Sequence, residues 1–161
     1  MSKEALRRKL RIKRLAMKQV EVEAKSRTIC DKLLAEIAEQ KFQKIHIYKS
    51  LTSLNEVDTK DSFNQLVERN LNKPGVEIIL GSNRENAPLP RQKFDLIIVP
   101  CLGFDKDNYR LGWGGGWYDR FLAKQPRALK IGLCFQNGFL PGSLPHEPHD
   151  IPMDKVITEV Y

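Results

Sequence analysis

The stretch Asp95-Leu-Ile-Ile-Val-Pro100 decides the fold, because it is a run of consecutive apolar residues closed by a proline. A strand with one face in water alternates apolar and polar side chains, whereas a strand covered on both faces is apolar throughout. The run is therefore predicted to be a central strand with helices packed on both sides. Pro100 ends the strand, since proline lacks the N–H that a strand ladder requires.

Helices and strands alternate on either side of this run. Helices are predicted at residues 3–18, 20–40, 59–73 and 117–124. Strands are predicted at residues 45–49, 76–80, 95–100, 130–135 and 156–159. This alternation favours an α/β fold with three layers, α/β/α, and a mostly parallel central sheet. The length favours a single domain over residues 1–161.

The composition is that of an ordinary soluble globular protein, with 41% hydrophobic and 29% charged residues. It excludes a disordered chain, a collagen-like repeat and a disulfide scaffold. No apolar stretch has the length of a signal-peptide core or a membrane helix. The cysteines (Cys30, Cys101 and Cys134) are odd in number and lack disulfide or metal spacing. We therefore expect a reduced, cytoplasmic protein with no membrane partner.

The net charge of +7 lies entirely in residues 1–34, which hold eleven basic and four acidic side chains. The remaining residues carry sixteen charges of each sign. A basic segment of this kind indicates an anionic partner, which is either a nucleic acid, a membrane surface or a phosphorylated or carboxylated small molecule.

The densest signal is a glycine-rich segment, Arg110-Leu-Gly-Trp-Gly-Gly-Gly-Trp-Tyr-Asp-Arg120, in which four of the ten glycines fall within five residues. It follows the central strand, and ligands of open α/β sheets bind beyond the carboxyl ends of the strands. Glycines let backbone N–H groups approach a phosphate. The segment matches neither the Rossmann nor the Walker A pattern. The structural alternative is a cluster of turns between core aromatic residues.

Together with Asp95–Asp105, the segment Arg110–Arg120 resembles the signature of the 5-formyltetrahydrofolate cyclo-ligase family, whose members are also called 5,10-methenyltetrahydrofolate synthetases. Three further segments resemble the family in the right order: Ser2–Leu10, Asn55–Thr59 and His149–Glu159. The resemblance spans the chain and implies a fold like that of the NagB/RpiA/CoA-transferase proteins.

The resemblance implies conversion of 5-formyltetrahydrofolate, with or without a polyglutamate tail, to 5,10-methenyltetrahydrofolate. ATP is consumed with Mg²⁺ and is released as ADP and phosphate. In this reaction the γ-phosphoryl group passes to the formyl oxygen, and N10 of the folate then attacks the activated carbon. No nucleophilic side chain is required, and the protein is expected to act as a monomer without nucleic acid.

The resemblance also implies roles for particular residues. The ATP-binding set is Lys3, Arg7, Arg110, Leu111, Gly112, Trp113, Gly114, Gly115, Gly116, Trp117 and Tyr118. Arg110 is the implied catalytic residue, which stabilises charge on the transferred group. Lys3 and Arg7 stand four residues apart and share one helical face. Their alternative role is a solvated basic face.

The implied metal ligands are Asp119 and Asp154. Their alternatives are a helix-start carboxylate at Asp119 and a turn residue at Asp154. The implied substrate-binding residues are Glu56, which would bind the pterin ring, and Leu51, Trp113, Trp117 and Tyr118, which would line its site.

Two features depart from simple expectation. Asn108 stands where the family commonly has glycine, and asparagine tolerates the same left-handed turn. The spacing of His146, His149 and Asp150 is that of metal ligands, but a fourth strong ligand is missing. We therefore expect this segment to line the substrate site rather than to bind zinc.

Two other functional classes fit parts of the sequence. A nucleic-acid-binding module would use the basic N-terminal segment, but it leaves the glycine-rich segment unexplained. A sugar-phosphate isomerase or CoA transferase would share the fold. Dependence on ATP separates the cyclo-ligase from both of these enzymes.

Overall fold

The computed structural model describes residues 1–70, 73–81 and 86–160. Its helices are α1 (Lys3–Leu15), α2 (Gln19–Ile37), α3 (Lys60–Asn70) and α4 (Trp117–Ala123), with short 3-10 helices at Thr52–Leu54 and Gln136–Gly138. Its strands are β1 (Lys44–Ile47), β2 (Glu77–Leu80), β3 (Leu96–Pro100), β4 (Gly103–Asp105), β5 (Arg110–Leu111), β6 (Leu129–Leu133), β7 (Phe139–Leu140) and β8 (Lys155–Ile157). Among the described residues, no helix combines the length and apolar character that crossing a bilayer requires.

Within the described residues, the main sheet has five strands in the order β2-β1-β3-β6-β8, and every neighbouring pair is parallel. The apolar run forms β3, the middle strand, with Ile97 opposite His46 on β1 and Lys130 on β6. All five residues of β3 are buried. The predicted central strand is therefore confirmed.

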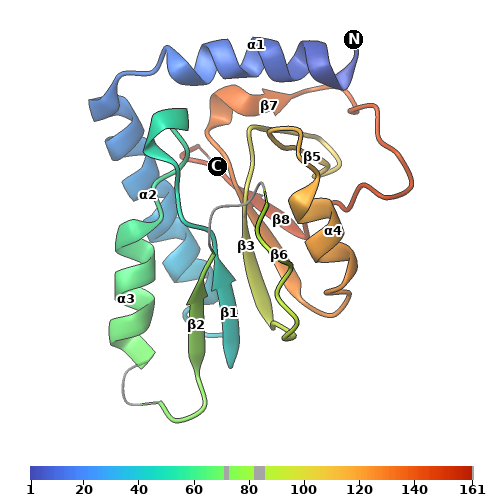
Figure 1. Ribbon diagram of the computed structural model, residues 1–161. Coiled ribbons are helices and arrows are strands. Elements are labelled where there is room, and N and C mark those ends of the chain that lie inside the picture. The colour runs from blue at the N-terminus through green and yellow to red at the C-terminus, as the bar shows by residue number, and fades with distance from the viewer. Residues whose placement is uncertain (71–72, 82–85, 161) are drawn as a thin grey trace.

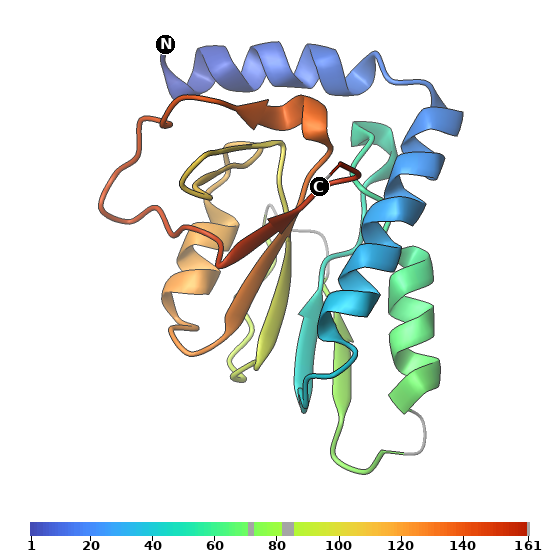
Figure 2. The ribbon, with the colours of Figure 1, turned by 180° about the vertical axis from the view of Figure 1, so that it is seen from behind.

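Helices cover both faces of this sheet. Helices α2 and α3 lie on one face and α4 on the other (Figures 1 and 2). On the α4 face, the ring of His46 packs edge-on against that of Phe121, with the centroids 5.0 Å apart. The predicted three-layer α/β/α architecture with a parallel sheet is confirmed.

The segments expected to be loops contain a second, smaller sheet of three strands in the order β5-β4-β7. Strands of two or three residues are too short to show an alternating pattern, so the sequence gives no sign of them. The first helix ends at Leu15 rather than at residue 18, and Met17 is buried in the turn that follows. The predicted extension of the third helix to residue 73 crosses residues 71–72, which lie outside the described residues.

Helix α1 lies across the carboxyl ends of the parallel strands, at the top of Figure 1. Leu10 on its inner face belongs to a cluster of buried side chains with Leu102, which follows β3, and Leu111 on β5. The basic N-terminal segment is therefore placed directly over the edge of the sheet where ligands of this fold class bind.

Candidate functional site

The candidate site is a cavity of about 280 Å³ at the carboxyl edge of the sheet. The loops after β1 and β3 supply its walls, at the edge of the sheet where the sequence predicted a ligand. The lining residues are Leu51, Ser53, Leu54, Pro100, Arg110, Gly112, Trp113, Gly114, Gly115, Gly116, Trp117, Tyr118 and Asp119. The segment 146–150, which was expected to line the site, is not part of this wall.

The glycine-rich segment needs glycine for steric reasons at particular positions. Gly114 and Gly116 have φ angles of 119° and 67°, which residues with a side chain rarely adopt. A Cβ atom at Gly112 would lie 2.5 Å from Nη1 of Arg110, so that the arginine would have to move. Around Gly115, by contrast, no atom of the described residues lies within 4 Å of a Cβ position. The segment therefore presents bare backbone to the cavity, which suits a phosphate group.

Arg110 forms part of the cavity wall with its side chain only 6% exposed. Its Nη2 donates a hydrogen bond of 3.1 Å to Oδ1 of Asp119, and its guanidinium lies 5.5 Å from the ring centroid of Tyr118. Its buried Nε finds no acceptor among the described residues. The cavity thus holds a positive charge that Asp119 keeps in place. Because this charge is poorly hydrated, its interaction with an anion is stronger than it would be in water.

Arg7 and Lys3 have different surroundings, although they share a face of α1. Arg7 donates from Nε to the carbonyl of Gly112 over 3.1 Å and so reaches the glycine-rich segment. Lys3 instead forms an ion pair with Asp150, in the segment that follows β7. The structure brings Arg7 to the cavity wall and leaves Lys3 one helical turn away, on a carboxylate.

Burial of Asp150 opposes its ionisation, but the hydrogen bonds that it accepts from Lys3 and from the amide of Glu147 outweigh this and lower its pKa below the ordinary carboxyl value. The neighbouring histidines have other partners. His146 stacks on Tyr109 with the ring centroids 4.1 Å apart, and Nε2 of His149 lies 3.2 Å from Glu147. Within residues 1–70, 73–81 and 86–160, no group of three or more His, Cys, Asp or Glu residues is arranged to hold a metal ion.

The two carboxylates proposed as metal ligands lie at opposite edges of the sheet. Asp119 is on α4 at the cavity, whereas Asp154 immediately precedes β8 and is exposed at the amino edge. Its Oδ2 accepts a 2.7 Å hydrogen bond from the N–H of Lys130, and its own N–H donates to the carbonyl of the same residue. The structure does not bring Asp154 together with Asp119.

Glu56 is 3% exposed and lies behind the wall rather than on it. Its Oε2 accepts from the N–H of Leu51 over 2.8 Å, and its Oε1 accepts from Nε1 of Trp113 over 3.1 Å. Both partners line the cavity. Glu56 therefore connects the loop after β1 to the glycine-rich segment.

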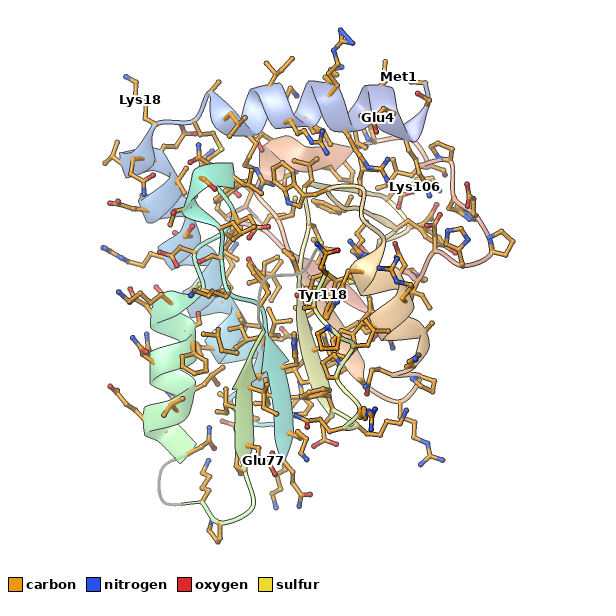
Figure 3. All side chains as sticks on the ribbon, viewed as in Figure 1. Met1, Glu4, Lys18, Glu77, Lys106 and Tyr118 are labelled. Carbon is orange, nitrogen blue, oxygen red and sulfur yellow. The ribbon has the colours of Figure 1, made fainter. Side chains whose placement is uncertain are left out.

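Two aromatic residues of the site, Trp117 and Tyr118, are buried in the core. Trp117 and Tyr118 are 8% and 5% exposed, with ring centroids 4.9 Å apart, and Nε1 of Trp117 donates to the carbonyl of Ala87. Tyr118 lies near the centre of the molecule, whereas Glu4 and Lys18 mark the α1 region at its top (Figure 3). These two aromatic side chains are therefore part of the core as well as of the wall.

Two arginines of α1 that were not among the predicted site residues contact the loops that form the site. Arg14 is 2% exposed and donates from Nη2 to the carbonyls of Cys101 and Leu102 over 3.0 and 3.1 Å. Arg11 donates to the carbonyl of Trp113 and places its guanidinium 5.6 Å from the centroid of that ring. The available signal was the spacing of Arg7, Arg11 and Arg14, which puts all three on one face of the helix.

Asn108 adopts the left-handed conformation expected of it, with a φ angle of 62°. It lies between β4 and β5, at the turn that leads the chain into Arg110. The asparagine therefore serves the same turn for which the family commonly uses glycine.

Comparisons with known proteins point to one family. The model of the 5-formyltetrahydrofolate cyclo-ligase family matches residues 80–159, which include the glycine-rich segment. A 5-formyltetrahydrofolate cyclo-ligase of Mycoplasma pneumoniae is 34% identical, and the match covers 99% of each chain.

Solved structures agree as well. The 5,10-methenyltetrahydrofolate synthetase of Mycoplasma pneumoniae superposes with a TM-score of 0.81 at 29% identity, over 99% of each chain. That of Aquifex aeolicus gives 0.78 at 26% identity, over 100% of this chain and 91% of the other. The full-length match shows that the chain belongs to the 5-formyltetrahydrofolate cyclo-ligase family.

Proposed function

We propose that this protein, as a single domain of residues 1–161, converts 5-formyltetrahydrofolate to 5,10-methenyltetrahydrofolate at the expense of ATP. The observation that carries the proposal is the cavity where bare glycine backbone, Arg110 and Asp119 meet beside aromatic side chains. One wall suits phosphate groups and the other suits a flat ring, as the two substrates of this reaction require.

The chemistry explains why such a cavity suffices. A formamide carbonyl is a poor electrophile, and its oxygen is a poor leaving group. Transfer of the γ-phosphoryl group to the formyl oxygen leaves an iminium carbon bearing a phosphate, which N10 of the same folate attacks. This attack closes the ring, and loss of phosphate together with the N10 proton then gives the methenyl product. The protein needs only to align the reactants and to stabilise charge.

Arg110 is proposed to hold the transferred phosphoryl group. Its guanidinium is oriented by Asp119 and shielded by Tyr118, so little reorganisation is needed when charge develops. Arg7, which reaches the carbonyl of Gly112, would bind the remaining phosphates with the backbone of residues 111–118. Lys3 would join them from the preceding turn after leaving Asp150.

The cavity wall offers one carboxylate for Mg²⁺. Magnesium in proteins is commonly held by one or two carboxylates together with substrate phosphates and water. Asp119 supplies one carboxylate at the cavity wall, with its side chain 24% exposed. We propose Asp119 as the protein ligand and assign no such role to Asp154. The ion would neutralise phosphate charge.

The folate is proposed to lie against Leu51, Trp113, Trp117 and Tyr118, all of which line the cavity. Glu56 would bind the pterin through the oxygen that now accepts from Trp113. The ring N–H donors of a pterin match a carboxylate in the same way as the indole N–H does.

The state of the protein in the cell is part of the proposal. All three cysteines are free and buried, and burial raises the pKa of Cys30 to about 11, which makes its thiol unreactive. Free, buried thiols support a reducing cytoplasm, and we propose that the protein acts there as a monomer. Light scattering after gel filtration would test the monomer, and a stable dimer would contradict it.

An absorbance assay tests the function directly. Purified protein with 5-formyltetrahydrofolate, ATP and Mg²⁺ should form methenyltetrahydrofolate, and omission of ATP should stop it. Absence of ATP-dependent product from folded protein would contradict the proposal. Turnover of a sugar phosphate or a CoA ester without ATP would favour the other enzymes of this fold class. Nucleic-acid binding is disfavoured, because Arg7, Arg11 and Arg14 point into the protein rather than outward.

A further inference from the structure

The guanidinium of Arg11 makes two different contacts with one residue. Its Nη2 donates to the carbonyl of Trp113, and its Cζ lies 5.6 Å from the centroid of the Trp113 ring. The backbone and the side chain of Trp113 are therefore fixed by the same group, which comes from α1 and is more than a hundred residues away in the sequence.

Trp113 is held by contacts from outside its own segment: besides Arg11, these are the hydrogen bond to Glu56 and packing against the buried cluster that contains Leu10 and Leu102. It stands between Gly112 and Gly114, and neither neighbour has a side chain that packs. The backbone at Gly114, with a φ of 119°, is in a conformation that only glycine adopts readily. A tryptophan in such a segment depends on contacts from other parts of the chain for its orientation.

The orientation of Trp113 matters beyond the segment itself. Its Nε1 donates to Glu56 over 3.1 Å, and the second carboxylate oxygen of Glu56 accepts from the N–H of Leu51. Trp113 and Leu51 both line the cavity. A line of contacts thus runs from Arg11 through Trp113 and Glu56 to Leu51, and it joins α1 to both loops of the wall.

The unsatisfied part of Arg11 supports a role in the site. Its Nε is buried and has no hydrogen-bond partner in the part of the chain that the structure describes. Buried polar groups are normally paired, and leaving one unpaired opposes stability. The side chain of Arg11 is therefore placed for its contacts with Trp113, although its Nε is left without a hydrogen bond.

We propose that Arg11 is a positioning residue, which orients Trp113 as a wall of the folate site and thereby sets the position of the Glu56 carboxylate. The role rests on the proposed function and deepens it. It needs arginine in particular, because a planar guanidinium donates hydrogen bonds and stacks on an aromatic ring together, whereas the ammonium group of lysine is a point charge.

The test compares Arg11→Ala and Arg11→Lys with Arg8→Ala, which removes an exposed arginine from the outer face of the same helix. The first readout is 19F NMR of protein labelled with 5-fluorotryptophan. The chain has two tryptophans, so two resonances are expected, and Trp117→Phe assigns them. The second readout is the steady-state kinetics with each substrate varied separately.

In Arg11→Ala the Trp113 resonance should move while that of Trp117 stays in place. The KM for 5-formyltetrahydrofolate should rise about tenfold, with kcat and the KM for ATP within about threefold of wild type, since binding rather than chemistry is disturbed. Arg11→Lys keeps the charge without the planar stack. Its KM for 5-formyltetrahydrofolate should therefore lie between that of wild type and that of Arg11→Ala. Arg8→Ala should match wild type in both readouts.

The outcomes separate the two proposals. An unmoved Trp113 resonance would overturn the role of Arg11, and so would a moved resonance with an unchanged folate KM in an active enzyme. A fall in kcat that merely follows a loss of folded protein, with KM unchanged, would indicate a structural role only. Absence of turnover in the wild-type protein would instead count against the proposed function, while the NMR measurement would still report on the contact of Arg11 with Trp113.

Discussion

The two edges of the parallel sheet carry similar residues in different arrangements. At the carboxyl edge, Asp119 pairs with the side chain of Arg110 beside a cavity. At the amino edge, Asp154 binds the backbone of Lys130, and its carboxylate closes a turn at the surface. The same residue type therefore serves a site at one edge and a strand end at the other.

The difference follows from the connections of the fold. At the carboxyl edge the chain leaves the parallel strands in long loops, and residues of the loops after β1 and β3 enclose the cavity there. The amino edge is closed by short backbone hydrogen bonds such as that from Leu129 to Asp95. Arg110 and Asp119 near the first edge line a cavity, whereas Asp154 near the second edge is exposed to water.

Removal of the cavity charge should have the largest effect. Arg110→Ala should lower turnover by about 10³-fold, because the transferred phosphoryl group loses its fixed counter-charge. Arg127→Ala, which changes an exposed arginine near the amino edge, is the matched control and should retain activity. Absorbance of methenyltetrahydrofolate measures turnover. If Arg110→Ala stayed within a few-fold of wild type, the charge at the carboxyl edge would be no more important for turnover than that at the amino edge.

Arg14 tests whether α1 builds the carboxyl edge. Arg14→Met should lower the free energy of unfolding by about 3 kcal/mol, because the carbonyls of Cys101 and Leu102 lose their buried donor. Lys13→Met, at the exposed neighbouring position, should change it by less than about 0.5 kcal/mol. Urea denaturation measures both values, and equal stabilities of the two variants would show that the edge does not depend on this arginine.

The two aspartates compare the edges directly. Asp119→Asn should lower turnover about 10²-fold and raise the Mg²⁺ concentration needed for half-maximal rate, as expected when a carboxylate leaves the phosphate-binding region. Asp154→Asn should keep turnover within about threefold and lower the melting temperature by a few degrees, since it weakens one hydrogen bond. A Mg²⁺ requirement that rises only in Asp154→Asn would reverse this assignment.

His46, between the two edges, gives the smallest effect. Burial lowers its pKa to about 4. The unfolded chain binds a proton near pH 6.5, so protonation favours unfolding as the pH falls from 6.5 to 4. The expected loss by pH 5 is about 2 kcal/mol, relative to pH 7.

Urea denaturation at several pH values measures this loss. His46→Phe should remove that part of the pH dependence, whereas His149→Ala, at an exposed position, should keep it. An identical pH profile in wild type and His46→Phe would show that another group is responsible.

Some features followed from local sequence and others did not. The run at residues 96–100 predicted a buried central strand, because a strand that is covered on both faces is apolar at every position. The short strands β4, β5 and β7 carry no such pattern. In the same way, Arg110 and the glycines form one continuous motif, whereas the use of Arg14 depends on carbonyls that lie 87 and 88 residues away.

The sequence by itself determined the layered α/β fold, the family and the loop that forms the cavity, since these depend on apolar periodicity and on a contiguous motif. Only the tertiary structure decided which charges serve the site. It turned Arg11 and Arg14 inward, paired Lys3 with Asp150 and separated Asp154 from Asp119 by the height of the sheet. The interaction between two charges depends on the distance between them in space. For residues far apart in the chain, the local sequence does not show that distance.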